Sequence, residues 1–175
     1  YTHYRIPSIC RTPSGRLLAF TEARRSRPSR SWEWEYALVR DEVHCLMKHS
    51  DDNGQTWSTP QVVIDRGTSY EARDPGPVLD CDTGELFLIT GQGPWIISSR
   101  DDGRTWSEPR SLAESAPGAF QNFRPGVGNC AIQLRHGPHR GRLLLALSVY
   151  PGAVCLMYSD DHGKTWLPGA LSAYN

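Results

Sequence analysis

Short apolar runs separated by turns rich in Gly, Asp and Asn recur along the chain, and they predict a protein made of β-strands. In three places a run follows a glycine that closes a hairpin, at residues 15–20, 84–89 and 141–147. A shorter run precedes each glycine, at residues 6–11, 77–79 and 131–134. Later runs occupy residues 44–48, 95–98 and 153–158, and a fourth strand is clearest at 61–64. Each unit therefore predicts a four-stranded antiparallel meander.

One octapeptide, Ser-x-Asp-x-Gly-x-Thr-Trp, occurs in every unit, at residues 50–57, 99–106 and 159–166. Its Asp can accept hydrogen bonds from backbone N–H groups a few residues on, and its Gly takes a positive φ at low cost. We expect the Thr to begin the next strand and the Trp to cover the sheet. A pattern that recurs with agreement at five positions predicts a repeat architecture.

The spacing of the octapeptides predicts a β-propeller. They start 49 and 60 residues apart (50 to 99, 99 to 159), which suits one four-stranded blade each. The expected blades are roughly 1–66, 67–115 and 116–175. Because three blades do not close a ring and would leave sheet edges open, we expect this chain to be part of a larger propeller.

The first unit carries a long insertion. From the hairpin glycine to the octapeptide serine are 35 residues in unit one (15 to 50), against 15 in unit two (84 to 99) and 18 in unit three (141 to 159). The added segment, from residue 24 to residue 42, is rich in Arg, Trp, Tyr and Glu. It is either a functional loop or a solvated surface loop.

Four residues are candidates for chemistry, and three of them have a structural alternative. Arg5 opens an inner strand, where its planar guanidinium suits a carboxylate ligand or a structural ion pair. Arg24 stands at the far end of the adjoining strand. Asp41, at the end of the insertion, is either a general acid for a glycosidic bond or a strand-edge carboxylate in water. Asp74 is placed to accept hydrogen bonds from a sugar, to pair with Arg73 or to cap a proline turn.

The chain resembles the sialidase (neuraminidase) family over essentially its whole length. The resemblance rests on Arg-Ile-Pro at residues 5–7, on Leu-Leu-Ala-Phe-x-Glu-x-Arg at residues 17–24 and on the three octapeptides, which match the family's Asp-boxes. It implies an all-β, six-bladed propeller that releases terminal sialic acid from glycans with retention of configuration. It also implies that the boxes are structural and lie on the rim opposite the active site.

The same resemblance assigns roles to the candidate residues. Arg5 is implied to be the first of three arginines that hold the sugar's carboxylate, and Arg24 to be a second conserved site arginine. Asp41 is implied to be the acid/base, with a two-residue shift from the family's usual spacing, and Glu42 is the weaker choice. Asp74 is implied to face the N-acetyl or 4-hydroxyl region. The family's tyrosine nucleophile, its glutamate and the other two arginines of the triad match nothing in these 175 residues. An isolated chain of this length is therefore expected to be inactive.

Composition narrows the function classes. The 19 basic and 19 acidic residues balance, which gives no indication of a nucleic-acid partner, and no apolar run is long enough for a transmembrane segment. The five cysteines are scattered, so we expect buried small side chains rather than a metal site, and a disulfide pair stays possible. Sialidase chemistry is expected to need no cofactor and no metal. The alternative function is a non-catalytic Asp-box propeller that binds glycans or proteins.

Overall fold

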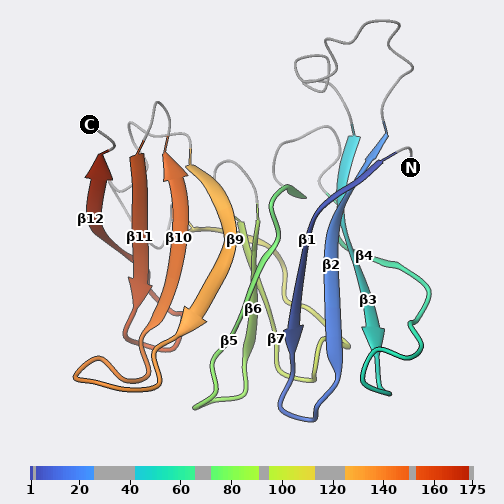
Figure 1. Cartoon of the computed structure of the whole chain (residues 1–175), viewed down its shortest axis with the longest axis horizontal. Coiled ribbons are helices and arrows are strands. Elements are labelled where there is room, and N and C mark those ends of the chain that lie inside the picture. Colours follow the sequence, from blue (N-terminus) through green and yellow to red (C-terminus); the bar gives the residue numbers. More distant parts are fainter. Residues whose placement is uncertain are drawn as a thin grey trace, which may run out of the picture.

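A computed structural model describes residues 1, 3–25, 42–65, 72–90, 95–112, 125–149 and 153–173. In this part of the chain, twelve strands form three four-stranded antiparallel sheets that stand one after another (Figure 1). The first sheet holds β1 (His3–Arg11), β2 (Leu17–Arg25), β3 (Glu42–Ser50) and β4 (Gln61–Asp65). The second holds β5 (Gly76–Leu79), β6 (Leu86–Thr90), β7 (Trp95–Ser99) and β8 (Arg110–Ser111). The third holds β9 (Pro125–Gln133), β10 (Leu143–Val149), β11 (Ala153–Ser159) and β12 (Leu167–Ala173).

Each sheet is a simple meander, since its strands pair in the order in which they occur along the chain. The all-β fold and the four-stranded units expected from the sequence are confirmed. The proposed blade limits at residues 66 and 115 fall in segments outside the described residues and stay a prediction.

The hydrophobic cores lie between the sheets. One cluster joins the first two sheets and includes Leu18, Phe20 and Met47 from the first and Leu86 and Leu88 from the second. The other cluster joins the second and third sheets in the same way. Sheets packed face to face bury alternate residues of each strand, so these contacts fix which face of a strand is internal.

Alternate residues on the outward faces of the first and third sheets are exposed. The side chains of Ile9 and Cys10 point to opposite faces of β1: Ile9 is 60% exposed, and Cys10 packs on the core. On the third sheet, Ile132 and Leu156 are 56% and 45% exposed, while their neighbours Ala131 and Cys155 pack on the core. Both end sheets therefore present apolar surface, which is the pattern expected for a part of a longer stack of blades.

The three Asp-boxes share one hydrogen-bond scheme. In the first box the Ser50 hydroxyl accepts from the N–H of Gly54 (2.8 Å) and donates to Asp52 Oδ1 (2.7 Å). Asp52 in turn accepts from the backbone N–H of Thr56 (2.8 Å) and from its hydroxyl (2.5 Å). These bonds hold the pKa of Asp52 down at about 2, the Thr56 hydroxyl contributing most. The second and third boxes repeat the scheme.

The expected role of the box threonine is wrong. Thr56 lies in the turn, and the next strand begins at Gln61; in the third box the strand begins at Leu167, after Thr165. The threonine hydroxyl donates a hydrogen bond to the box aspartate. It therefore stabilises the turn and does not begin a strand.

The box of one sheet packs on the sheet before it. Trp166 is fully buried in the cluster between the second and third sheets, and Trp106 meets the Phe20 ring edge-on at 6.0 Å between centroids. Trp57, in the first box, is 37% exposed. Trp106 and Trp166 therefore fill space between neighbouring sheets. Trp57 lies on the face of the first sheet that no described sheet covers.

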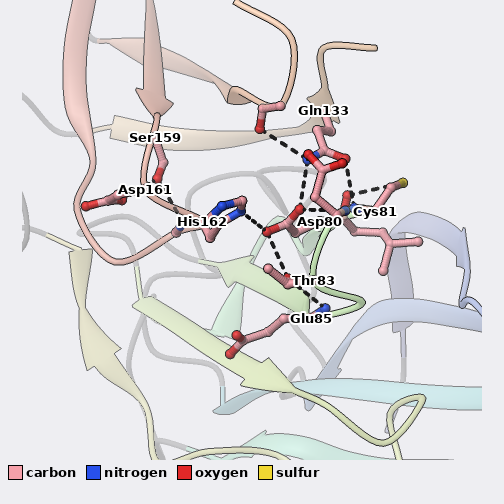
Figure 2. Close-up of polar contacts among 12 residues, drawn as sticks. Asp80, Cys81, Thr83, Glu85, Gln133, Ser159, Asp161 and His162 are labelled. Atoms are coloured by element: carbon pink, nitrogen blue, oxygen red, sulfur yellow. Dashed lines mark hydrogen bonds and ion pairs between the residues drawn. The ribbon is translucent and has the colours of Figure 1, made fainter.

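Hydrogen bonds between polar side chains join the second and third sheets beside the third box (Figure 2). The buried carboxylate of Asp80, at the end of β5, meets Nδ1 of His162 in the third box at 2.7 Å. It also accepts hydrogen bonds from Gln133 Nε2 (2.8 Å) and from the hydroxyl of Thr83 (2.9 Å). In the second box, Asp102 bonds to Ser14 and Thr12 of the first sheet's hairpin in the equivalent way. The fourth residue of the second and third boxes thus joins each of these two boxes to the hairpin of the preceding sheet.

A box glycine packed on the preceding sheet predicts a large and specific substitution effect. Gly163 has φ +77°, and a Cβ there lies 2.5 Å from the Phe87 ring. We expect Gly163→Ala to destabilise the protein by about 2–5 kcal/mol, from the left-handed backbone and from overpacking. The control is Gly137→Ala, which has φ +81° and nothing within 4 Å, and costs only the backbone part of about 1–2 kcal/mol. Chemical denaturation of both variants measures the difference, and equal losses contradict the packing assignment.

Candidate active site

The candidate residues gather at the end of the first sheet that lies away from the boxes. In the strand register, Arg5 of β1 is opposite Glu22 of β2, and Arg24 is opposite Val43 of β3. At the other end of β2, Leu17 is opposite Ser50, which opens the first box. Arg5 and Arg24 therefore lie at one rim of the sheet and the box at the other, as the sialidase resemblance implies.

Glu22 and Arg24 form a buried ion pair on the face of β2 that looks toward the second sheet. They continue the strand phase of Leu18 and Phe20, which are core residues. Glu22 is fully buried and Arg24 is 5% exposed. Arg24 donates from Nε to Glu22 Oε2 at 2.7 Å, and its Nη2 also contacts that oxygen. A charge at a core position has to be paired, so each group holds the other in place.

Asp74 completes this group from the second unit. Its backbone N–H donates to Glu22 Oε1 at 2.8 Å, across 52 positions of sequence. Burial raises the pKa of Asp74 to about 6, and the charge and the nearby carboxyl group of Glu22 act in the same direction. Arg73 and Arg24 oppose the rise. Asp74 thus contacts Glu22, which pairs with Arg24, and Asp74 itself is half-buried.

Backbone irregularities accompany the site. The register of β1 against β2 shifts between Arg5 and Ser8, and Ile6 in that bulge has φ +53°. The hydroxyl of Thr21 donates to the backbone oxygen of Arg5 at 2.8 Å and holds the strand before the bulge. Asp74 has φ +52°. A β-branched residue at positive φ is strained, and bulges re-aim side chains near functional sites, so Arg5 and Asp74 both sit where the fold accepts strain.

The proposed general acid is outside the described residues. Asp41 and the insertion from residue 26 to residue 41 have no described structure. Glu42, the weaker candidate, begins β3 opposite Arg25, next to the rim that carries Arg24. The structure therefore brings Arg5, Arg24 and Asp74 to one end of the first sheet and does not test the role of Asp41.

Glu22 is the residue that sequence reasoning missed. It appears in the motif at residues 17–24, but no role followed from the motif alone. The alternation of the strand could have indicated its burial. Side chains two positions apart point to the same face, so Glu22 lies on the buried face that carries Phe20. A charged residue in that phase requires a partner and so indicates a built polar site.

The described residues hold no group of three or more His, Cys, Asp or Glu side chains that is arranged for a metal. The described thiols are all unpaired: Cys45 is buried, Cys10 and Cys155 are half-buried, and Cys81 is exposed. Burial raises the pKa of Cys10 to about 12, as expected for a thiol that packs as a small hydrophobe. In the same part of the chain, no helix has the length and apolar character needed to cross a membrane.

A family model described as a BNR repeat-like domain matches residues 39–173, which is most of the chain. The chain belongs to the BNR repeat-like family. Its relatives include a sialidase of Micromonospora viridifaciens, 30% identical over 97% of this chain and 29% of that protein. Sialidase-4 of Homo sapiens is 30% identical over 96% of this chain and 40% of the relative. The resemblance to sialidases is confirmed by these relatives.

Solved structures confirm the fold. The Hadza microbial sialidase Hz136 superposes with a TM-score of 0.75 at 22% identity, over 97% of this chain and 37% of that one. The chain therefore has the sialidase β-propeller fold, with three blades in the described residues. This BNR repeat-like chain spans well under half the length of these three sialidases.

Proposed function

We propose that the protein containing this chain is an exo-α-sialidase, a glycoside hydrolase that releases terminal sialic acid from sialylated glycans. The observation that carries the proposal is the group of Arg5, Glu22, Arg24 and Asp74 at the rim opposite the boxes, in a chain whose relatives are named sialidases. Arg5 at the end of its strand suits the carboxylate of an acidic sugar. Arg24, held in place by Glu22, and the carboxyl group of Asp74 provide further polar contacts for the same sugar.

The proposed roles follow the chemistry of the ligand. The sialic acid carboxylate sits beside the anomeric carbon, so a guanidinium at Arg5 fixes both the charge and the orientation of the ring. Arg24 and Asp74 bind the remainder of the sugar from the same rim. Asp41 protonates the leaving oxygen and then activates water, which gives retention when a nucleophile is supplied by the rest of the protein.

The experiment uses the full-length protein and a fluorogenic sialoside. Release of the fluorophore, with free sialic acid as the second product, supports the proposal. Binding of sialyllactose without hydrolysis assigns the protein to the alternative class, a non-catalytic propeller. Absence of both hydrolysis and binding overturns the proposal.

The stereochemical part of the proposal has its own measurement. Proton NMR of the first product formed from an α-sialoside distinguishes retention from inversion. We expect the α-anomer to appear first and to mutarotate afterwards, and initial formation of the β-anomer contradicts the assigned roles.

A further inference from the structure

A β-bulge in β1 lies directly after Arg5, at the rim where the candidate site residues gather. The ladder between β1 and β2 shifts between Arg5 and Ser8, so residues 6–7 of β1 lie opposite the single residue Thr21 of β2. An extra residue in one strand bends that strand and changes the direction of nearby side chains. Arg5 is the last residue paired before this bend, so its direction depends on how the bulge is held.

The bulge lacks one backbone donor and is strained. Pro7 has no backbone N–H, so it cannot donate to a neighbouring carbonyl. Ile6 has φ +53°, a left-handed conformation that a β-branched residue rarely adopts. A backbone in this state persists only where the surrounding contacts hold it.

The hydroxyl of Thr21 supplies such a contact from the neighbouring strand. It donates to the backbone oxygen of Arg5 at 2.8 Å. The backbone oxygen of Glu22, the next residue in the chain, is 3.3 Å from the same hydroxyl, so Arg5 offers the closer acceptor. Thr21 is half-buried, and the bond is therefore partly shielded from water.

We propose that Thr21 is a positioning residue for Arg5: its hydroxyl holds the Arg5 backbone at the bulge and so aims the guanidinium at the carboxylate of the sugar. The inference rests on the proposed sialidase function and deepens it by adding a residue that acts through Arg5. A bidentate contact between arginine and carboxylate depends on the direction of the planar guanidinium. Without the hydroxyl, the strained backbone at Ile6 relaxes and Arg5 turns with it, and a displacement of about 1 Å is enough to weaken the contact.

The first measurement is the steady-state kinetics of the full-length protein with sialyllactose. Thr21→Val removes the hydroxyl and keeps a strand-forming side chain of similar size, and we expect KM to rise about threefold to tenfold, the range that one hydrogen bond contributes. The sugar carboxylate is ionised before and during the reaction, so kcat stays within about twofold. Thr21→Ser keeps the hydroxyl and should keep KM within about twofold of wild type. A wild-type KM in Thr21→Val, or no recovery in Thr21→Ser, overturns the inference.

A double-mutant cycle tests whether Thr21 acts through Arg5. In a protein that already carries Arg5→Ala, adding Thr21→Val should change kcat/KM by no more than about twofold, because the guanidinium that Thr21 aims is gone. If the two losses multiply, Thr21 acts independently of Arg5 and the inference is wrong.

Two further variants separate positioning from a general loss of stability. Thr21→Ala removes the hydroxyl with a different side chain, so it should give the same rise in KM as Thr21→Val. The matched control is Thr83→Val, which removes a hydroxyl that donates to Asp80 at 2.9 Å at the box rim. It loses a hydrogen bond but should keep the wild-type KM. Urea unfolding of each variant measures stability, and a rise in KM in Thr83→Val equal to that in Thr21→Val contradicts the positioning role.

The outcomes distinguish this inference from the proposed function. If the full-length wild-type protein neither binds nor cleaves sialosides, the proposed function fails, and the role of Thr21 fails with it. If wild type cleaves sialosides and Thr21→Val does so with the same KM, the positioning role is wrong and the sialidase assignment stands.

Discussion

Replacing Arg5 with alanine in the full-length protein is expected to lower kcat/KM for a sialoside by about 100-fold to 1,000-fold. This is the usual loss when one preorganised hydrogen-bond donor is removed from an active site. Arg5 is half-buried at the rim beside Glu22, and its backbone is fixed by Thr21 and followed by a bulge. The variant loses the planar fork that binds a carboxylate through two parallel hydrogen bonds.

The control for this prediction is on the same strand. Arg11→Ala removes an exposed arginine at the box end of β1, where Nε reaches the Gly15 oxygen at 3.4 Å. Its kcat/KM should stay within about twofold of wild type, since exposed contacts of this kind contribute little. Arg5→Lys keeps the charge without the fork and should recover only part of the activity. Full activity in Arg5→Ala would contradict the assignment of the rim as the site.

Replacing Glu22 with alanine is expected to cost about 3–5 kcal/mol of folding free energy, because it removes one member of a buried ion pair. The variant removes the buried carboxylate that pairs with Arg24, together with the acceptor of the Asp74 N–H. Equilibrium unfolding in urea, followed by tryptophan fluorescence, measures the change. The same variant should lose sialoside binding, since it releases both Arg24 and Asp74.

The matched control is Glu85→Ala, which removes another glutamate paired with a single arginine. Glu85 meets Arg100 at 2.9 Å; the Arg100 side chain is 81% exposed, and the Glu85 side chain is 13% exposed. A pair in contact with water contributes about 0–1 kcal/mol, so this variant should be nearly neutral. Similar losses in the two variants would show that burial does not distinguish the pairs and would contradict the account of Glu22.

Much of the site was visible in the sequence as separate parts. Arg24 at the end of an apolar strand and Asp74 beside two prolines both stood out as charged residues at strand ends. Their relation did not, because Glu22 and Asp74 are 52 positions apart and meet only when the first two units pack together. The role of Glu22 follows from that contact, and no motif spacing contains it.

The boxes show the same division. The hydrogen bonds within residues 50–57 are local, so the sequence pattern was enough to predict a tight turn with a glycine at positive φ. The prediction for the threonine was wrong. Threonine favours strands and was therefore expected to begin one, but its hydroxyl donates to the nearby Asp52 carboxylate and holds it in the turn. Local hydrogen bonding outweighed strand propensity.

The sequence by itself determined the strands, their order in each meander, the turns and the repeat, because periodicity and turn chemistry act between residues close along the chain. Only the tertiary structure decided which faces meet, such as Trp166 on the second sheet and Asp74 on Glu22. The physical reason is that an alternating strand presents two faces of similar composition. The face that becomes internal, and the charge that must then find a partner, are fixed only when a second sheet packs against it.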